Sequence, residues 1–104
     1  MLTRDASEAD FQSVVMALAK QYDWETFHAS VHRVADTYRT DGRGFPDLVL
    51  AHPTRGVIFA ELKTERGRLT DAQKDWATAL SPHVEWYCWR PSQLQLIAKR
   101  LSGS

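Results

Sequence analysis

The chain has 104 residues, of which 43% are hydrophobic and 25% are charged, and this composition favours one folded domain over a disordered segment. Its 13 Lys and Arg residues balance 13 Asp and Glu residues, so the formal net charge of +0 excludes a histone-like basic surface. A local basic patch could still hold nucleic acid. The single cysteine, Cys88, excludes a disulfide framework and a cysteine-based zinc site.

No apolar run is long enough to cross a membrane; those at 48–51 and 57–60 are typical of strands. The N-terminal region carries acids at Asp5, Glu8 and Asp10 and no apolar stretch, which argues against a signal peptide. We therefore expect a cytoplasmic protein with no membrane partner.

The first expected element is a helix over residues 8–22, because Phe11, Val15 and Leu18 recur on one helical face. Ser7, with an acid three residues later, has the spacing of an N-terminal cap. The short aromatic stretch that follows, residues 24–29, predicts a first strand.

Residues 30–44 contain few apolar residues and several basic ones. We expect a mobile basic loop here, which could include a helical turn at 31–38. A loop of this length in a small domain is often functional.

Residues 45–51 and 57–63 are the clearest strands, and the turn chemistry of 52–56 predicts that they form an antiparallel hairpin. Both strands are apolar on both faces, so the hairpin should lie in the centre of the sheet.

A helix is expected over 70–80, a fourth strand over 84–89, and a last helix that opens at Pro91. A helix between the third and fourth strands favours a parallel pair. The expected fold class is α/β, with a mixed β-sheet flanked by helices in the order α-β-β-β-α-β-α.

Three charged residues should converge in this fold. Glu61 and Lys63 share one face of their strand, and Asp47 begins the neighbouring strand of the hairpin. Two carboxylates held close together repel, and one of them takes up a proton unless a divalent cation lies nearby. Mg²⁺ favours one or two carboxylates with water and phosphate oxygens, and a lysine beside it can stabilise transition-state charge.

These residues also resemble a known family. The Pro-Asp pair at 46–47 and Glu-Leu-Lys at 61–63 are similar to the PD-(D/E)xK nuclease signature. Further blocks resemble the VRR-NUC branch of that superfamily: GFPDL at 44–48, ELKTERGRL at 61–69, QKDW at 73–76 and WRP at 89–91. The short signature occurs by chance, whereas all blocks in this order are specific. The resemblance implies a restriction-endonuclease-like fold and a single nuclease domain over residues 1–104.

The resemblance also implies roles for individual residues. Asp47 and Glu61 would bind Mg²⁺ or Mn²⁺ together with the backbone carbonyl of Leu62, and Lys63 would be the catalytic lysine. The alternatives from the residues themselves are a turn role for Asp47, and a solvated strand end or a mutual ion pair for Glu61 and Lys63.

Two further residues match the family pattern. Glu8 occupies the place of an acidic residue that completes the site, and it shares its helical face with Phe11, unlike Asp10. Its alternative role is that of a first-turn acid favoured by the helix dipole. Gln73 matches the family's QxxW block, but it also has the spacing of a capping box with Thr70, and the two roles could coexist.

The remaining residues with distinctive chemistry have more ordinary expectations. The core is expected to include Trp76, Trp86, Trp89 and Phe59, whose alternative role is base stacking. Cys88 is expected as inert packing, and the four scattered histidines are not expected to bind a metal, although His28 or His32 could lie near DNA. Basic residues flanking the site in sequence are candidate phosphate contacts. They are Arg33, Arg39, Arg43, Arg66, Arg68 and Lys74.

These observations lead to the hypothesis of a Mg²⁺- or Mn²⁺-dependent DNA endonuclease that hydrolyses phosphodiester bonds. A single compact domain offers little surface for reading sequence, which favours structure-selective cutting. Stand-alone members of the resembled family are similar to homodimeric Holliday-junction-resolving enzymes, often from phages. This resemblance implies a homodimer that acts on branched DNA in a bacterial or phage-infected host cell. The alternatives are a module that binds nucleic acid or supports assembly without cutting, and a nuclease subunit that needs a partner.

Overall fold

The computed structural model describes residues 2–29 and 42–104. In these residues the elements follow the expected order. They are α1 (Glu8–Gln21), β1 (Glu25–His28), β2 (Leu48–His52), β3 (Gly56–Leu62), α2 (Asp71–Leu80), β4 (Glu85–Trp89), the 3₁₀ helix η1 (Pro91–Gln93) and α3 (Leu94–Ser102). The helical turn expected at 31–38, the candidate phosphate contacts Arg33 and Arg39, and most of the basic loop lie outside the described residues.

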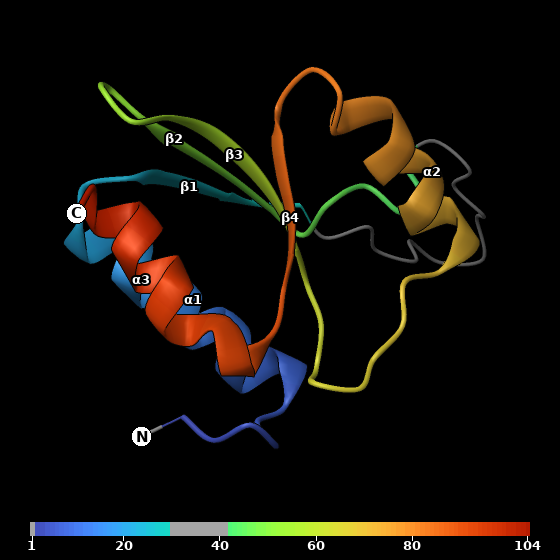
Figure 1. Cartoon of the computed structure of the whole chain (residues 1–104), viewed down its shortest axis with the longest axis horizontal. Helices are drawn as coiled ribbons and strands as arrows, with labels where there is room; N and C mark the ends of the chain where they lie inside the picture. Colours follow the sequence, from blue (N-terminus) through green and yellow to red (C-terminus); the bar gives the residue numbers. More distant parts are fainter. Residues whose placement is uncertain (1, 30–41) are drawn as a thin grey trace, which may run out of the picture.

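The described strands form one mixed sheet in the order β1-β2-β3-β4 (Figure 1). Strand β2 runs antiparallel to β1 and β3, whereas β3 and β4 are parallel across the α2 crossover. The predicted central hairpin and the predicted parallel pair are both confirmed. The α/β class and the element order are confirmed too, and the arrangement is consistent with a restriction-endonuclease-like fold.

The two faces of the sheet differ because alternate side chains of each strand point to opposite sides. Leu50 and Ile58 lie opposite each other in the hairpin and are fully buried. They share a core with apolar side chains of α1 and α3, which lie side by side (Figure 1). This core contains Phe11, Val15, Ala19, Trp24, Leu48, Leu50, Ile58, Ala60, Leu62, Trp89, Ile97 and Leu101.

Helix α1 begins and ends with specific polar contacts. The Ser7 hydroxyl accepts a hydrogen bond from the Asp10 amide at 3.1 Å, which confirms the predicted cap. At the other end, the Trp24 indole donates to the Leu101 carbonyl at 2.9 Å. This bond joins the segment after α1 to the end of α3, so both helices are held on the same face of the sheet.

The boundaries differ from the sequence-based expectations by up to three residues. Strand β2 begins at Leu48 rather than at 45, since Pro46 has no amide hydrogen to donate to a ladder. Strand β3 ends at Leu62, but the Lys63 amide still donates to the Trp89 carbonyl at 3.0 Å. The last helix begins with the 3₁₀ turn η1 at Pro91 and becomes α-helical at Leu94. None of the described helices is long and apolar enough to cross a membrane.

The two faces of the hairpin should respond differently to truncation. Leu50→Ala should lower the free energy of unfolding by about 2–5 kcal/mol, because it leaves a cavity in the core. Val57→Ala, at a side chain that is 46% exposed, should cost about 1 kcal/mol or less. Urea unfolding of both variants measures the difference, and equal losses would contradict the assignment of the two faces.

Candidate active site

Asp47 is fixed at the point where the hairpin opens. Its side-chain Oδ2 accepts a hydrogen bond from the Leu62 amide at 2.8 Å, one residue beyond the last backbone pair of the two strands. On its other side, the Asp47 carbonyl accepts from the Ala29 amide at 2.8 Å. The carboxylate therefore bridges β2 to the end of β3, which is a different arrangement from that of a simple turn residue.

Glu61 is the one buried charged residue among those described, with 1% of its surface exposed. The pKa of this carboxyl is raised to about 9, first by burial and then by the hydrogen bond and the negative charge of Asp47. The positive charge of Lys63 opposes this shift, and the negative charge of Glu8 adds to it. Glu61 is thus not a solvated strand end.

Gln73 reaches the site from the first turn of α2. Its amide nitrogen donates to Glu61 Oε1 at 3.1 Å. Its amide oxygen accepts from the Thr70 backbone amide at 2.8 Å, while the Thr70 hydroxyl accepts from the Gln73 backbone amide at 3.2 Å. The capping box and the contact with the buried carboxyl therefore coexist, because each uses a different end of the amide.

Lys63 and Glu8 act on Glu61 through their charges. Lys63 is half-buried and follows β3 directly, whereas Glu8 is exposed at the first residue of α1. Both influence the pKa of Glu61, Glu8 as the smallest cause. In residues 2–29 and 42–104, no three His, Cys, Asp or Glu side chains are grouped so that they could hold a metal ion. The structure therefore brings Asp47 and Glu61 together but does not bring Glu8 into the same cluster.

The segment directly before Asp47 packs closely against α2. Gly44 has a φ of +81°, and a Cβ atom there would lie 2.6 Å from both the Ala72 oxygen and the Gln73 nitrogen. The Trp76 indole donates to the Arg43 carbonyl at 2.9 Å. Only glycine fits at this crossing, so the backbone before β2 can touch the helix that carries Gln73.

An aromatic cluster closes the same crossing. The Phe45 ring packs edge-on against Phe59 and Trp76, with ring centroids 6.0 Å and 4.9 Å apart. Sequence reasoning assigned Phe59 and Trp76 to the core, which is wrong, because both are only half-buried and lie outside the core cluster. Together with Phe45 they join α2 to the segment before Asp47. The signal available was the glycine and phenylalanine directly before Pro46.

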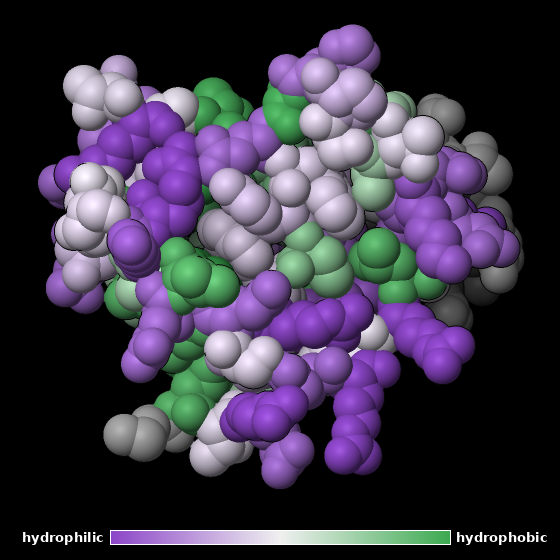
Figure 2. Space-filling view, in the orientation of Figure 1, coloured by the Kyte–Doolittle hydropathy of each residue, from purple (hydrophilic) through white to green (hydrophobic). Residues whose placement is uncertain are grey.

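Most candidate phosphate contacts in the described residues are at the surface. Arg43, Arg66, Arg68 and Lys74 are exposed. Figure 2 shows hydrophilic side chains gathered over α2 and the neighbouring loop. Cys88 lies opposite Glu61 in the β3–β4 register, and burial raises the pKa of its thiol, as expected for packing.

The chain matches the VRR-NUC domain family over residues 8–86. The chain belongs to the VRR-NUC family. The match spans α1 to β4 and includes Glu8, Asp47, Glu61, Lys63 and Gln73. As a VRR-NUC domain, the chain is a nuclease-type domain. No curated protein and no solved structure matches it.

The importance of the close backbone contact between the VRR-NUC signature segment and α2 for stability can be tested at two glycines. Gly42 and Gly44 both have positive φ, but a Cβ at Gly42 meets no described atom within 4 Å. Both alanine variants bear the cost of positive φ, and only Gly44→Ala adds a backbone collision. We expect a larger fall in melting temperature for Gly44→Ala, measured by circular dichroism. Equal falls would show that the close approach costs nothing.

The raised pKa of Glu61 predicts a pH dependence of stability. A carboxyl whose pKa is near 4.5 when unfolded and about 9 when folded binds its proton more tightly in the folded protein. The stability it contributes is complete below about pH 4.5 and is lost as pH rises through about 9. In EDTA, the free energy of unfolding of the wild type should therefore fall with rising pH relative to Glu61→Gln. A constant difference between the two proteins would contradict this.

Proposed function

We propose that this VRR-NUC domain is a Mg²⁺- or Mn²⁺-dependent DNA endonuclease that cuts branched DNA as a homodimer. The observation that carries the proposal is Glu61, an acid buried beside Asp47 at the open end of the sheet. A buried carboxyl pair is costly for stability, and it is kept where either a shared proton or a cation offsets the repulsion.

The donor set fits a hard divalent cation. Asp47 and Glu61 offer carboxylate oxygens, and the backbone carbonyl of Leu62 lies between Glu61 and Lys63 in the chain. Mg²⁺ is commonly held by one or two carboxylates, with water and substrate phosphate completing its shell. Two carboxylates therefore suffice, and Glu8 would act at longer range through its charge.

Each residue would have a distinct task. When bound, the cation would polarise a phosphate oxygen and lower the pKa of an attacking water. Gln73 donates to one oxygen of Glu61, and the Glu61 carboxyl also hydrogen-bonds with Asp47, so two side chains fix its orientation. Lys63, whose charge already acts on Glu61, would stabilise the negative charge that develops on the phosphate.

The DNA side of the proposal depends on the surface around this cluster. Arg43, Arg66, Arg68 and Lys74 are exposed near the elements that carry Lys63 and Gln73, and basic side chains at such positions contact phosphates. These contacts carry no sequence information, which favours recognition of DNA shape. Two symmetric cuts in a junction require two sites, and a homodimer supplies them.

A second candidate is a module that binds nucleic acid without cutting, or a subunit that needs a partner. The observation that favours it is the raised pKa of Glu61 together with the lack, within the described ranges, of a three-ligand cluster. A Glu61 that keeps its proton in the presence of Mg²⁺ would leave the fold without its metal.

The proposal can be tested with purified protein and four labelled substrates: a four-way junction, a flap, a duplex and a single strand. Reactions contain Mg²⁺, Mn²⁺ or EDTA, and Asp47→Ala is the control. Metal-dependent paired cuts in the junction support a dimeric junction nuclease. Cutting of flaps or single strands would keep the chemistry and reject the junction. Tight junction binding without any cutting would favour the second candidate.

Lys63→Ala should reduce cleavage by at least about 100-fold, since it removes the charge expected to stabilise the transition state. DNA binding and the melting temperature should change little, because Lys63 makes no side-chain hydrogen bond or ion pair with the described residues. Single-turnover rates at saturating DNA and gel-shift titrations separate these effects. Wild-type turnover in this variant would reject the assigned role.

A further inference from the structure

The chain makes a tight turn directly after Lys63. The Gly67 amide donates to the Thr64 carbonyl at 3.2 Å, and a Cβ atom at Gly67 would lie 2.9 Å from the Thr64 hydroxyl. This turn begins the loop of residues 63–70 that leads from β3 to α2 (Figure 1). It therefore connects the residue expected to be catalytic with the helix that delivers Gln73.

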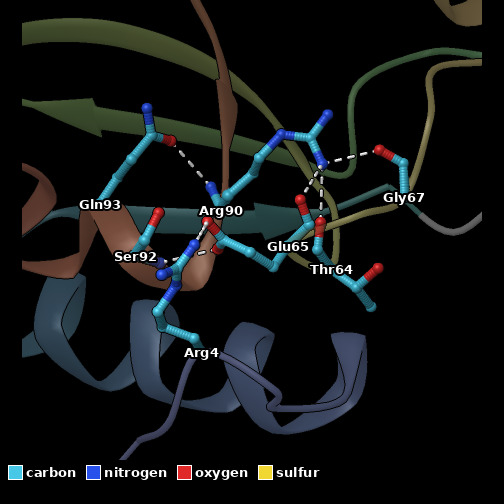
Figure 3. A network of polar contacts seen from close by, with 7 residues as sticks. All are labelled: Arg4, Thr64, Glu65, Gly67, Arg90, Ser92 and Gln93. Carbon is cyan, nitrogen blue, oxygen red and sulfur yellow. Dashed lines mark hydrogen bonds and ion pairs between the residues drawn. The ribbon is translucent and has the colours of Figure 1, made fainter.

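Three carbonyl oxygens of this turn converge on one guanidinium. Nη1 of Arg90 donates to the carbonyls of Thr64 at 2.7 Å, Glu65 at 3.2 Å and Gly67 at 2.7 Å (Figure 3). Converging carbonyl dipoles repel one another, so the turn needs a cation at their centre. Here that cation is a half-buried arginine of the protein itself.

Arg90 is in turn held firmly. It follows Trp89, whose carbonyl pairs with the Lys63 amide, so its backbone starts beside the turn it binds. The Gln93 side chain accepts from the Arg90 amide at 2.9 Å. A long side chain fixed at its base loses less freedom on binding than a free one, which strengthens the contact.

A second connection joins the same two segments. The Glu65 carboxylate accepts from the Ser92 amide at 3.1 Å and lies 3.4 Å from Arg4 (Figure 3). The Ser92 side chain first, and then the Ser92 amide, lower the pKa of Glu65 by hydrogen bonding to its carboxylate, so the carboxylate stays ionised at neutral pH. The turn is thus bound to the segment after β4 in two ways: its backbone carbonyls accept from Arg90, and the Glu65 carboxylate accepts from Ser92.

We propose that Arg90 is a positioning residue for the nuclease site. Its guanidinium holds the 64–67 turn, and this sets the direction in which Lys63, Arg66 and Arg68 face DNA. The proposal rests on the proposed function for its effect on catalysis. Arg90 lies in the WRP block at 89–91, four residues past residue 86, where the family match ends.

Two kinds of contact make different predictions. Nη1 is directed at three carbonyls, so Arg90 does not serve as a phosphate contact through this nitrogen. Loss of a phosphate contact reduces the slope of the logarithm of DNA affinity against the logarithm of salt concentration by about 1. Loss of a positioning residue lowers kcat while the salt dependence stays the same.

The first test needs no activity. Hydrogen–deuterium exchange of the full chain compares the wild type with Arg90→Met, which keeps length without charge, and Arg90→Lys, which keeps charge on a shorter side chain. We expect faster exchange at 64–70 in both variants, and more so in Arg90→Met. The matched control is Arg100→Met, because Arg100 is also half-buried and binds Glu85 and the Arg55 carbonyl away from the turn. It should lower stability without changing exchange at 64–70.

The second test uses cleavage. Arg90→Met should lower kcat by about 10- to 100-fold, with the KM for DNA and the salt dependence of binding unchanged. In Arg90→Ala, millimolar guanidinium should restore part of the rate, whereas equal NaCl should not, and Lys63→Ala should show no rescue.

The outcomes separate the two proposals. Unchanged exchange at 64–70 in Arg90→Met would overturn the positioning role whether or not the protein cuts DNA. A lower salt dependence in Arg90→Met would overturn it in favour of a phosphate contact. If the wild type cuts no substrate, the nuclease function fails, and the exchange data still decide whether Arg90 holds the turn.

Discussion

The burial of one carboxyl group, that of Glu61, is the constraint on which the rest of the site depends. An acid that is 1% exposed beside a second acid cannot ionise without help, and its pKa of about 9 expresses that cost. The neighbouring Gln73 amide and the Asp47 carboxyl are arranged to meet its hydrogen-bonding needs. An apolar residue at this position would pack against the sheet at lower cost, so stability alone does not account for an acid there.

The scaffold serves this constraint by dividing the sheet into two faces. One face carries the core, which α1 and α3 cover, and it supplies most of the apolar burial. The other face is covered at one end by α2 and the aromatic cluster of Phe45, Phe59 and Trp76. The buried carboxyl of Glu61 lies at that covered end, on the same face of β3 as Phe59. The core and the candidate site therefore lie on opposite faces of the same strand.

The connections between elements also serve the site. Gly44 allows the segment before Asp47 to touch α2, and the Arg90 guanidinium holds the turn after Lys63. Both are polar or steric contacts between segments far apart in the chain. They hold the start of β2, next to Asp47, and the end of β3, next to Lys63, so the residues of the VRR-NUC signature keep their positions in a small domain.

Much of this protein follows from local sequence. The period of two in 57–63 placed Glu61 and Lys63 on one face, and the turn at 52–56 placed Asp47 beside them, because strand geometry and hairpin pairing act over a few residues. The capping-box role of Gln73, beside its role at the site, was also predictable from its spacing to Thr70. Only the tertiary structure decided that Glu61 is buried and that Glu8 is exposed. It also decided the close contact of Gly44 with α2 and the hydrogen bonds from Arg90 to the 64–67 turn. Each of these depends on how α1, α2 and the loops pack against the sheet, and packing between distant segments has no signature in local periodicity.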